Sequence, residues 1–470
     1  MNTRPTIIAF LAAVIAVVAV VMFGELKPLD TAAADGERPF LQNDDVIPVD
    51  DVDRIILQRD EDDVEYVWER NGAEWTQVAP FEHPMVPYSM RQYVVRANEL
   101  VNHGTVKFDD SALSMNDLAL ETPRATIRYE WGDNGSLELK LGRRGIAGRA
   151  YVQHAGENQP VAVVSQGLHE RIFDFSPVEA REARLFPDVS IDADRIERRV
   201  FDQVMVLERK RSRWQMNEPA ATRVDDSMFN QYLETLAKAR AVAFIRDQPD
   251  QLGSYGLAEP VAELTIVTSE TILEDDKPVR VSGSQTLFLG SGCGGGTQDR
   301  FAMLEGRPTV FRLSGAAING LFAEAAFIVD PTGSDARIED IRSIRIDGPE
   351  GAFTLARAAS VGTDTWIAPD HDNVQVSASL IAQLVDQLTT LRASGVEFAE
   401  YPTNLNVATV TFFGNDRRAF DTVRIARDPA TGNWALENGD SVLRILPPSI
   451  EFRVTPRAFD LESVINESGE

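Results

Sequence analysis

Cys293 is the residue best suited to covalent chemistry, because it is the only cysteine of the 470-residue chain. It lies in the run "GSGCGGG", which holds five glycines between Gly290 and Gly296. A phosphate cradle needs a helix directly after its glycines, so that the amides point at the anion. In this chain "TQDRFAML" comes next, which is typical of a strand, and no histidine lies close enough in sequence to nominate a base. We interpret the run as a turn between strands and Cys293 as an unreactive thiol.

Histidines and acidic turns are the next candidates for chemistry. The five histidines show no zinc-ligand spacing, and we expect surface or turn positions for them: His83, His103, His154, His169 and His371. The acidic stretches "DEDD" (Asp60–Asp63) and "PDHDN" (Pro369–Asn373) offer oxygen ligands without the spacing of a calcium loop. We expect solvated turns there, with a calcium site as the alternative.

Tryptophans and carboxylates raise the question of sugar chemistry. A glycosidase needs two carboxylates that meet in a cleft, and the spacing in one sequence does not show such a pair. Three of the six tryptophans recur in a repeat and are better explained by packing than by sugar stacking. We predict no catalytic, cofactor-binding or metal-binding residue, and hence no enzyme. An extracytoplasmic protein that binds or hydrolyses cell-wall glycans is the alternative.

Charge excludes one class of partner. Acidic residues outnumber basic ones and give a net charge of −27, whereas nucleic-acid binding needs clustered Lys and Arg. One basic cluster opposes this background: Arg195, Arg198, Arg199, Arg209, Lys210, Arg211 and Arg213. It is either a solvated hairpin or a docking patch for an acidic partner. Arg209, Lys210 and Arg211 are the candidate partner contact.

The N-terminus indicates the compartment. An apolar run of 17 residues, Ile7 to Phe23, follows Arg4 and precedes an acidic stretch. As a helix it reaches about 25 Å, at the short end of what spans a bilayer. The positive-inside rule predicts a single-pass protein of the bacterial inner membrane with most of the chain outside the cytoplasm, in the periplasm. A signal peptide cleaved near Ala32–Ala34 is the alternative.

A pattern returns three times along the rest of the chain. A hairpin ends in Trp75, Trp214 or Trp366, with an Arg on the preceding strand and a Pro soon after. Val-x-x-Ser follows and leads into a helix whose apolar stripe has helical spacing. The predicted stripes are Met90, Val94, Ala97 and Val101, then Phe229, Tyr232, Leu233 and Leu236, then Leu380, Leu384, Leu388 and Leu391. Asp225 and Ser377 are predicted helix N-caps.

The first two copies continue alike beyond the helix. "LGRRGIAGRAYVQ" from Leu141 matches "LGSGCGGGTQDRFAM" from Leu289, and each copy ends in a short helix at Phe173 or Phe322. The third copy departs from this pattern in its C-terminal half, as a capping repeat does.

The predicted fold class is α+β, with an N-terminal transmembrane helix before three tandem repeats. Each repeat is expected to be a mainly antiparallel sheet with one long packed helix. The predicted parts are a transmembrane anchor (1–24), a polar tether (25–49), repeats over 50–188, 189–333 and 334–462, and a tail (463–470).

The motifs resemble those of the bacterial domain of unknown function 4340. "SYGLAEP" (Ser254–Pro260) and "LFLG" (Leu287–Gly290) carry the likeness best. The resemblance implies an anchored envelope protein, in a family whose members are often encoded beside ABC transporters of the gliding-motility or auxiliary type. It carries over no catalytic residue. We therefore expect a non-enzymatic accessory or scaffold protein whose partner is an integral membrane complex, an ABC-type permease.

Overall fold

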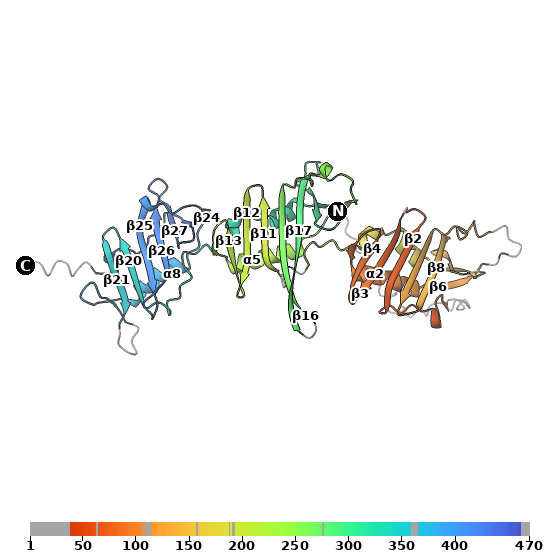
Figure 1. Cartoon of the computed structure of the whole chain (residues 1–470), viewed down its shortest axis with the longest axis horizontal. Helices are drawn as coiled ribbons and strands as arrows, with labels where there is room; N and C mark the ends of the chain where they lie inside the picture. The colour runs from red at the N-terminus through yellow and green to blue at the C-terminus, as the bar shows by residue number, and fades with distance from the viewer. Residues whose placement is uncertain are drawn as a thin grey trace, which may run out of the picture. The chain divides into compact units, whose positions relative to one another are not determined.

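The computed structural model describes residues 38–461, apart from 63, 107, 109–113, 157, 188, 190–192, 275, 276 and 359–364. These residues form three antiparallel sheets, each with helices packed on it (Figure 1). We call each sheet with its helices a module and number the modules along the chain.

The order of the strands across each sheet differs from their order along the chain. The first sheet has the order β1 (Arg38–Pro39), β6 (Val101–Thr105), β10 (Val161–Ser165), β9 (Arg149–His154), β8 (Gly135–Arg144), β7 (Ala125–Trp131), β2 (Val52–Arg59), β3 (Glu65–Asn71), β4 (Glu74–Ala79) and β5 (His83–Met85). The second has the order β14 (Thr222–Arg223), β13 (Arg213–Glu218), β12 (Gln203–Lys210), β11 (Ala193–Val200), β16 (Ala262–Glu274), β17 (Lys277–Gly292), β18 (Arg300–Leu304), β19 (Thr309–Leu313) and β15 (Ala243–Asp247). The third has the order β23 (Val374–Val376), β22 (Trp366–Ala368), β21 (Gly351–Arg357), β20 (Ser343–Gly348), β25 (Asn406–Phe413), β26 (Ala419–Arg427), β27 (Trp434–Glu437), β28 (Val442–Leu446) and β24 (Gly395–Phe398).

All three sheets have one topology. Apart from the added strand β1, the first sheet read from β5 to β6 has the same order as the second and the third. The predicted tandem repeat is therefore confirmed. The third sheet keeps all nine strands even where its sequence departs from the other copies. After β28, the described residues form a 3₁₀ turn (Pro456–Phe459) instead of the short α-helix of the other modules.

The predicted fold class is wrong. Of the residues that the structure describes, 44% are in strands and 19% in helices, so the fold is mainly antiparallel β and not α+β. The predicted transmembrane helix over Ile7–Phe23 lies outside the described residues. Within the described part of the chain, no helix is long and apolar enough to cross a membrane. The mainly antiparallel sheet expected for each repeat is present, but the helix packed on it is short, so its clear periodicity in the sequence gave the helices too much weight in the fold class.

One principal helix packs on each sheet, and shorter helices follow in the first two modules. The principal helices are α2 (Pro87–Asn98), α5 (Asp226–Lys238) and α8 (Ala378–Thr389), and the short ones are α3 (Gly167–Phe173), α6 (Gly315–Leu321) and α7 (Ala325–Ile328). The stripe predicted for α5 is confirmed at all four positions. In α8 the buried stripe also takes in Ile381 and Val385, whereas Leu380 is only half-buried and Leu391, also half-buried, lies beyond the end of the helix. In α2 the buried stripe also includes Tyr93. Val101, which was predicted to belong to this stripe, lies beyond the helix and begins β6.

The tryptophan hairpins confirm the predicted register. Each tryptophan pairs across strands with an arginine: Arg70 with Trp75, Arg209 with Trp214, and Arg357 with Trp366. Each tryptophan strand ends at the residue before its proline. Trp75 and Trp366 are buried, whereas Trp214 is half-buried and packs on Phe229 of α5, with ring centroids 4.7 Å apart.

Residues predicted as tether belong to the first module from Arg38 onward. Arg38 and Pro39 pair with the edge strand β6, and Leu41 and Ile47 are buried in the core. Asn98 exchanges two hydrogen bonds with the backbone of Ile47. Leu41 and Ile47 belong to two short apolar pairs, Phe40–Leu41 and Val46–Ile47, in a stretch without helical or strand period, so the sequence alone did not reveal these contacts.

The chain divides into two compact units, Met1–Glu182 and Ala183–Glu470. The second unit contains two modules, which share apolar contacts. Val442 of β28 is buried in the core of the second module, and Val396 and Phe398 of β24 pack against that core. The second and third modules therefore form one folded body.

Arg444 lies at the centre of this contact and is fully buried. Its guanidinium donates to the Asp440 carboxylate at 2.7 Å, to the Asp330 carbonyl at 2.9 Å and to Thr222 Oγ1 at 3.3 Å. Thr222 in turn donates to Asp440 at 2.5 Å. The network thus joins the second module, the connecting segment and the third module.

A second ion pair lies beside it. Arg392 contacts the Asp225 carboxylate at 2.5 Å, and the same carboxylate caps α5 by accepting from the Ser227 and Met228 amides. Burial raises the pKa of Asp225, but the hydrogen bonds from Met228 and Arg392 outweigh it and the pKa lies below its usual value. The predicted cap at Asp225 is confirmed. At Ser377 the hydroxyl makes no cap bond and instead contacts Ser379.

Replacing Arg444 by Met should destabilise the second unit by about 3 kcal/mol, because the Asp440 carboxylate would stay buried without its cation. Denaturant unfolding, with hydrogen exchange read at β24 and β28, measures the change. Arg345→Met is the matched control, because the Arg345–Asp347 pair is exposed and should cost less than about 1 kcal/mol. Equal losses in the two variants would contradict the central role of Arg444.

Candidate functional site

The candidate contact Arg209, Lys210 and Arg211 lies at the end of the β12–β13 hairpin. Arg211 is exposed in the turn with a φ of 54°, and Lys210 is exposed and donates to Asn217 at 3.2 Å. The Arg209 guanidinium carbon lies 5.4 Å from the centroid of the Trp214 ring, and this side chain is half-buried. Lys210 and Arg211 therefore present charge to solvent, while Arg209 also supports the hairpin.

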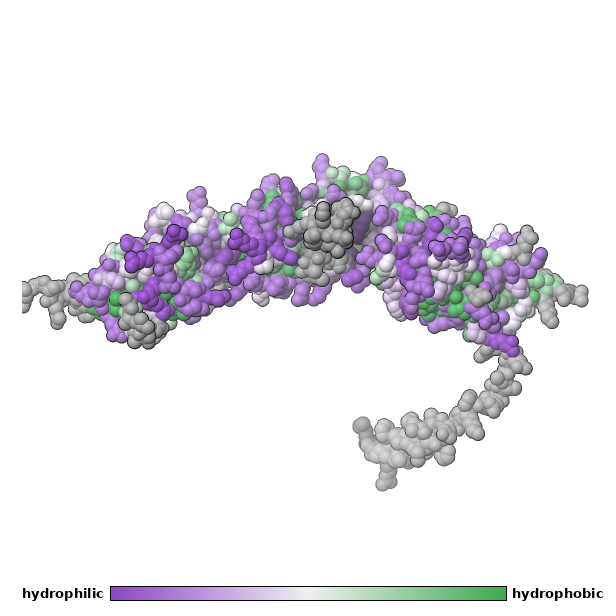
Figure 2. All heavy atoms as spheres, turned by 60° about the horizontal axis from the view of Figure 1, so that its bottom comes forward, coloured by the Kyte–Doolittle hydropathy of each residue, from purple (hydrophilic) through white to green (hydrophobic). Residues whose placement is uncertain are grey.

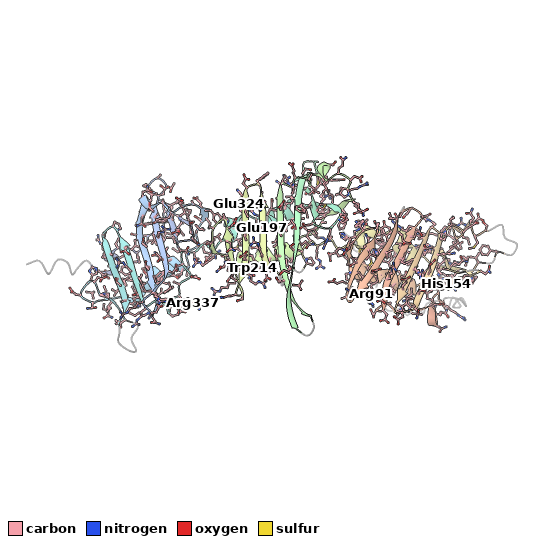
Figure 3. All side chains as sticks on the ribbon, viewed as in Figure 1. Arg91, His154, Glu197, Trp214, Glu324 and Arg337 are labelled. Carbon is pink, nitrogen blue, oxygen red and sulfur yellow. The ribbon has the colours of Figure 1, made fainter. Side chains whose placement is uncertain are left out.

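Three arginines of the predicted basic cluster have other roles. Arg195 pairs with Glu197, which is labelled on the second sheet in Figure 3, at 3.0 Å and also with Glu208, and Arg199 contacts Glu197 at 3.4 Å. Arg198 points into the core and is only 4% exposed. Alternation along β11 places it on the opposite face from Arg195 and Arg199. The exposed basic patch is consequently smaller than the sequence indicated.

The glycine run is a turn, as predicted. It joins β17 to β18, the Cys293 amide donates to the Asp299 carbonyl at 2.9 Å, and Gly294, Gly295 and Gly296 all have positive φ. Burial and the nearby Asp299 carboxylate raise the pKa of the Cys293 thiol. A raised pKa lowers the thiolate fraction, so the environment does not activate this cysteine.

The two motifs that carry the family resemblance, Ser254–Pro260 and Leu287–Gly290, contact each other in the structure. A Cβ on Gly290 would lie 2.2 Å from the Tyr255 carbonyl oxygen, and one on Gly256 would lie 2.6 Å from the Ser291 amide nitrogen. Gly256 also has a φ of 67°. The first module repeats this contact, since a Cβ on Gly142 would lie 2.3 Å from the Leu118 carbonyl. The motif glycines therefore allow a loop to cross a strand.

Two predicted surface histidines are buried. His83 is 3% exposed on β5, and His169 of α3 is fully buried. Burial, with a smaller contribution from Arg144, lowers the pKa of His169 to about 4. Within the described ranges, no group of three or more His, Cys, Asp or Glu side chains could hold a metal ion.

The acidic turn after β2 pairs with a cation of the protein itself. Arg59 contacts Asp62 at 2.5 Å and Glu61 at 3.0 Å. In the other acidic turn, Asp372 and Asn373 adopt positive φ between β22 and β23. Both stretches are turns, as predicted.

Tryptophan packing leaves few stacking surfaces. Four of the six rings are buried, namely those of Trp68, Trp75, Trp366 and Trp434. A buried ring has no free face for a sugar, so these four belong to the cores.

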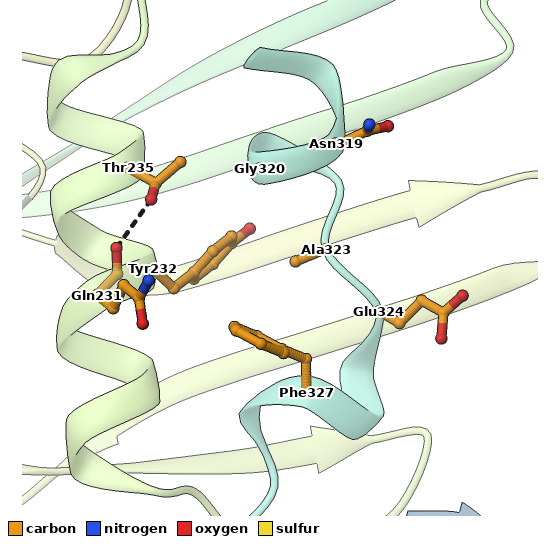
Figure 4. A pocket seen from close by; sticks show the side chains of 8 residues that line it. All are labelled: Gln231, Tyr232, Thr235, Asn319, Gly320, Ala323, Glu324 and Phe327. Carbon is orange, nitrogen blue, oxygen red and sulfur yellow. Dashed lines mark hydrogen bonds between the residues drawn. The ribbon is translucent and has the colours of Figure 1, made fainter. Parts of the chain in front are cut away.

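Sequence reasoning missed a pocket in the second module. It has a volume of about 380 Å³ and lies between α5 and the α6–α7 segment (Figure 4). Its lining residues are Gln231, Tyr232, Thr235, Asn319, Gly320, Ala323, Glu324 and Phe327. The Tyr232 hydroxyl donates to the Leu321 carbonyl at 3.0 Å, and Phe327 is 49% exposed. Gly320 was the one residue in the sequence that hinted at special packing here. Glycine inside a helix costs about 1 kcal/mol relative to alanine, so its presence suggests that neighbouring atoms leave no room for a side chain.

Comparison with known proteins places the chain in a family. The family model described as domain of unknown function (DUF4340) matches residues 75–245 and again residues 214–409. The chain therefore belongs to this family, as the motifs indicated. The two matches overlap over 214–245, the segment that holds β13, α5 and most of β15, so this segment ends one copy and begins the next. No curated protein matches the chain.

Replacing Gly290 by Ala should destabilise the second unit by about 2 kcal/mol, because the methyl group would meet a backbone carbonyl that moves little. Gly292→Ala is the matched control two residues along the same strand. There the nearest atom is 3.9 Å away, and a change within about 0.5 kcal/mol is expected. Thermal or denaturant unfolding compares the two, and equal stabilities would contradict the crossing-loop explanation.

His169 should make the first unit less stable as the pH falls. Its folded pKa of about 4 lies below the ordinary value of 6.5, so this contribution is full above pH 6.5 and is lost between pH 6.5 and 4. The loss reaches about 3 kcal/mol, because each pKa unit corresponds to about 1.4 kcal/mol. Unfolding of the wild type and of His169→Leu, followed at several pH values, measures it. A slope in this window that is unchanged by His169→Leu would refute the assignment.

Proposed function

We propose that the protein is a non-enzymatic accessory scaffold that acts outside the cytoplasm of a bacterium, held at the inner membrane through its apolar segment Ile7–Phe23. The observation that carries the proposal is the joint between the second and third modules, which is held by buried apolar contacts and by the Arg444 network. Repeated modules fixed to one another by buried contacts present several surfaces in a constant geometry. Such an arrangement suits binding to a large partner better than it suits chemistry in one cleft.

The proposed partner is an integral membrane complex, with an ABC-type permease as the specific candidate. Holding the modules at the membrane raises their effective concentration near such a complex. The surface view of the modules is mainly hydrophilic, as expected for a chain of net charge −27 (Figure 2). Lys210 and Arg211 oppose this background and are exposed, which makes them the proposed first contact with acidic residues of the partner.

Reversing both charges, by Lys210→Glu with Arg211→Glu, should weaken association with the membrane complex by about tenfold. The effect should be larger at low salt because mobile ions screen exposed charges. Co-purification of the full-length protein in mild detergent, with the complex identified by mass spectrometry, measures the association. Residues 38–461 alone, without the apolar segment, should bind the complex more weakly.

The matched control is Arg417→Glu with Arg418→Glu. These residues lie at another exposed hairpin end, and Arg417 has a positive φ as Arg211 has. The control changes the net charge equally and should leave the association intact. A full-length protein that purifies alone after gentle crosslinking, or residues 38–461 that hydrolyse a wall glycan, would contradict the scaffold proposal.

A further inference from the structure

The loop between β8 and β9 presents an apolar side chain to solvent among arginines. Ile146 is 90% exposed, more than any other large apolar side chain of the described residues. Arg143, Arg144 and Arg149 flank it in the sequence. Single exposed apolar side chains are common on protein surfaces, so the surroundings of Ile146 decide whether it has a partner.

Backbone hydrogen bonds hold this loop in place. The Gly145 amide donates to the Arg149 carbonyl at 2.8 Å and closes the turn around Ile146. On the other side, the Gln166 amide donates to the Gly148 carbonyl at 3.1 Å and ties the turn to the segment before α3. The turn is thus fixed at both sides, and Ile146 projects from it into solvent.

The arginines give the loop a local positive charge. Arg144 is half-buried and pairs with Asp174 at 2.7 Å, whereas Arg143 and Arg149 are exposed. Asp117 interacts electrostatically with Arg143. Three cations therefore face two carboxylates here, in a chain whose net charge is −27. An exposed apolar residue between two exposed arginines suits an anionic lipid surface.

The chain enters the first module at the same end of the sheet as this loop. Pro39 pairs with Val101 across β1 and β6, and the Val101 amide donates to Ser165 Oγ at 3.1 Å. Ser165 in turn pairs with Arg149 across β10 and β9. Neighbouring strands lie about 4.8 Å apart, so the start of β9 is about 14 Å across the sheet from Pro39.

The apolar segment Ile7–Phe23 is connected to β1 by residues 24–37. A stretch of this length reaches at most about 50 Å even when it is fully extended. A bilayer that holds the apolar segment therefore lies within reach of the β8–β9 loop, because the loop and the point of entry share one end of the sheet.

The equivalent turns of the other modules lack this combination. The turn between β17 and β18 consists of glycines around Cys293, and the turn between β26 and β27 reads "DPATGN" from Asp428. Neither turn contains a large apolar residue. An isoleucine between arginines thus occurs in the module that directly follows the apolar segment, where a membrane contact is within reach.

We propose that the β8–β9 loop docks on the anionic lipid bilayer that holds Ile7–Phe23. Ile146 enters the lipid at headgroup level, and Arg143 and Arg149 contact lipid phosphates. So small a contact binds weakly by itself, but the apolar segment gives the loop a high effective concentration at the surface. Acidic residues farther than about 8 Å from the headgroups oppose it little, because salt screens them. The inference rests on the proposed membrane anchorage and not on the proposed permease partner.

The test uses the full-length protein in nanodiscs of phosphatidylglycerol and phosphatidylcholine that contain a spin-labelled lipid. Ile146→Cys, combined with Cys293→Ser, is labelled with the small fluorophore NBD. The control carries the label at Thr297→Cys, an exposed position in the equivalent turn of the second module. The spin-labelled lipid should quench the label at position 146 at least about twofold more than the label at position 297, because only the first enters the lipid.

Charge reversal tests the arginines in the same assay. Arg143→Glu with Arg149→Glu should reduce the quenching at position 146 by at least about twofold, and so should nanodiscs of phosphatidylcholine alone. Arg417→Glu with Arg418→Glu changes the net charge equally at an exposed turn of the third module and should leave the quenching unchanged.

Equal quenching at positions 146 and 297 would overturn the proposal, and quenching that is the same in both lipids or after reversal of Arg143 and Arg149 would overturn the role of the arginines. Co-elution of the protein with the nanodiscs reports on the apolar segment separately. Protein that elutes without nanodiscs would refute the membrane anchorage, and the loop contact with it. Protein that co-elutes without quenching at position 146 would refute the loop contact alone.

Discussion

Each sheet must keep one face away from water, and this requirement organises the molecule. Nine strands spaced about 4.8 Å apart give a sheet roughly 40 Å wide, whereas a helix of 12 residues is about 18 Å long and about 10 Å across. One principal helix per module therefore leaves apolar surface exposed. Short helices complete the cover in the first two modules. In the third, the segment around Phe452 and Val454 packs on the core and is held to α8 by Gln387.

The same requirement explains how two modules became one unit. The edge strand β24 packs on α7 of the preceding module, and Val442 completes that module's core. The polar groups at this joint are buried when the two modules pack, so each needs a hydrogen-bond partner within the protein. Arg444, Asp440 and Thr222 satisfy one another, and Arg392 satisfies the carboxylate that caps α5. The joint thus combines apolar burial with a paired set of charges.

The covering helices of the second module leave a pocket between α5 and the α6–α7 segment. Gly320 allows α6 to approach α5 closely, because a Cβ there would lie 2.6 Å from Thr235 Cγ2. In the short helix of the first module, Arg171 instead stacks on the ring of Tyr93 in α2. Repeats that share a topology can therefore differ in how single residues of the covering helices pack, while the sheets beneath them remain alike.

The sequence by itself determined the elements whose signals are local. The tryptophans and prolines marked the hairpins, Val-x-x-Ser and the apolar stripes marked the helices, and the glycines around Cys293 marked a turn. These signals depend on neighbours in the chain, so the repeat and its family could be predicted. The proportion of helix in the fold could not be predicted, because periodicity reveals that a helix is present but not how large a sheet it covers. Only the tertiary structure decided that Arg198 and Arg444 are buried, that Gly290 meets Tyr255, and that Gly320 meets Thr235. Each of these contacts joins residues far apart in the chain, and their partners are set by how the layers pack.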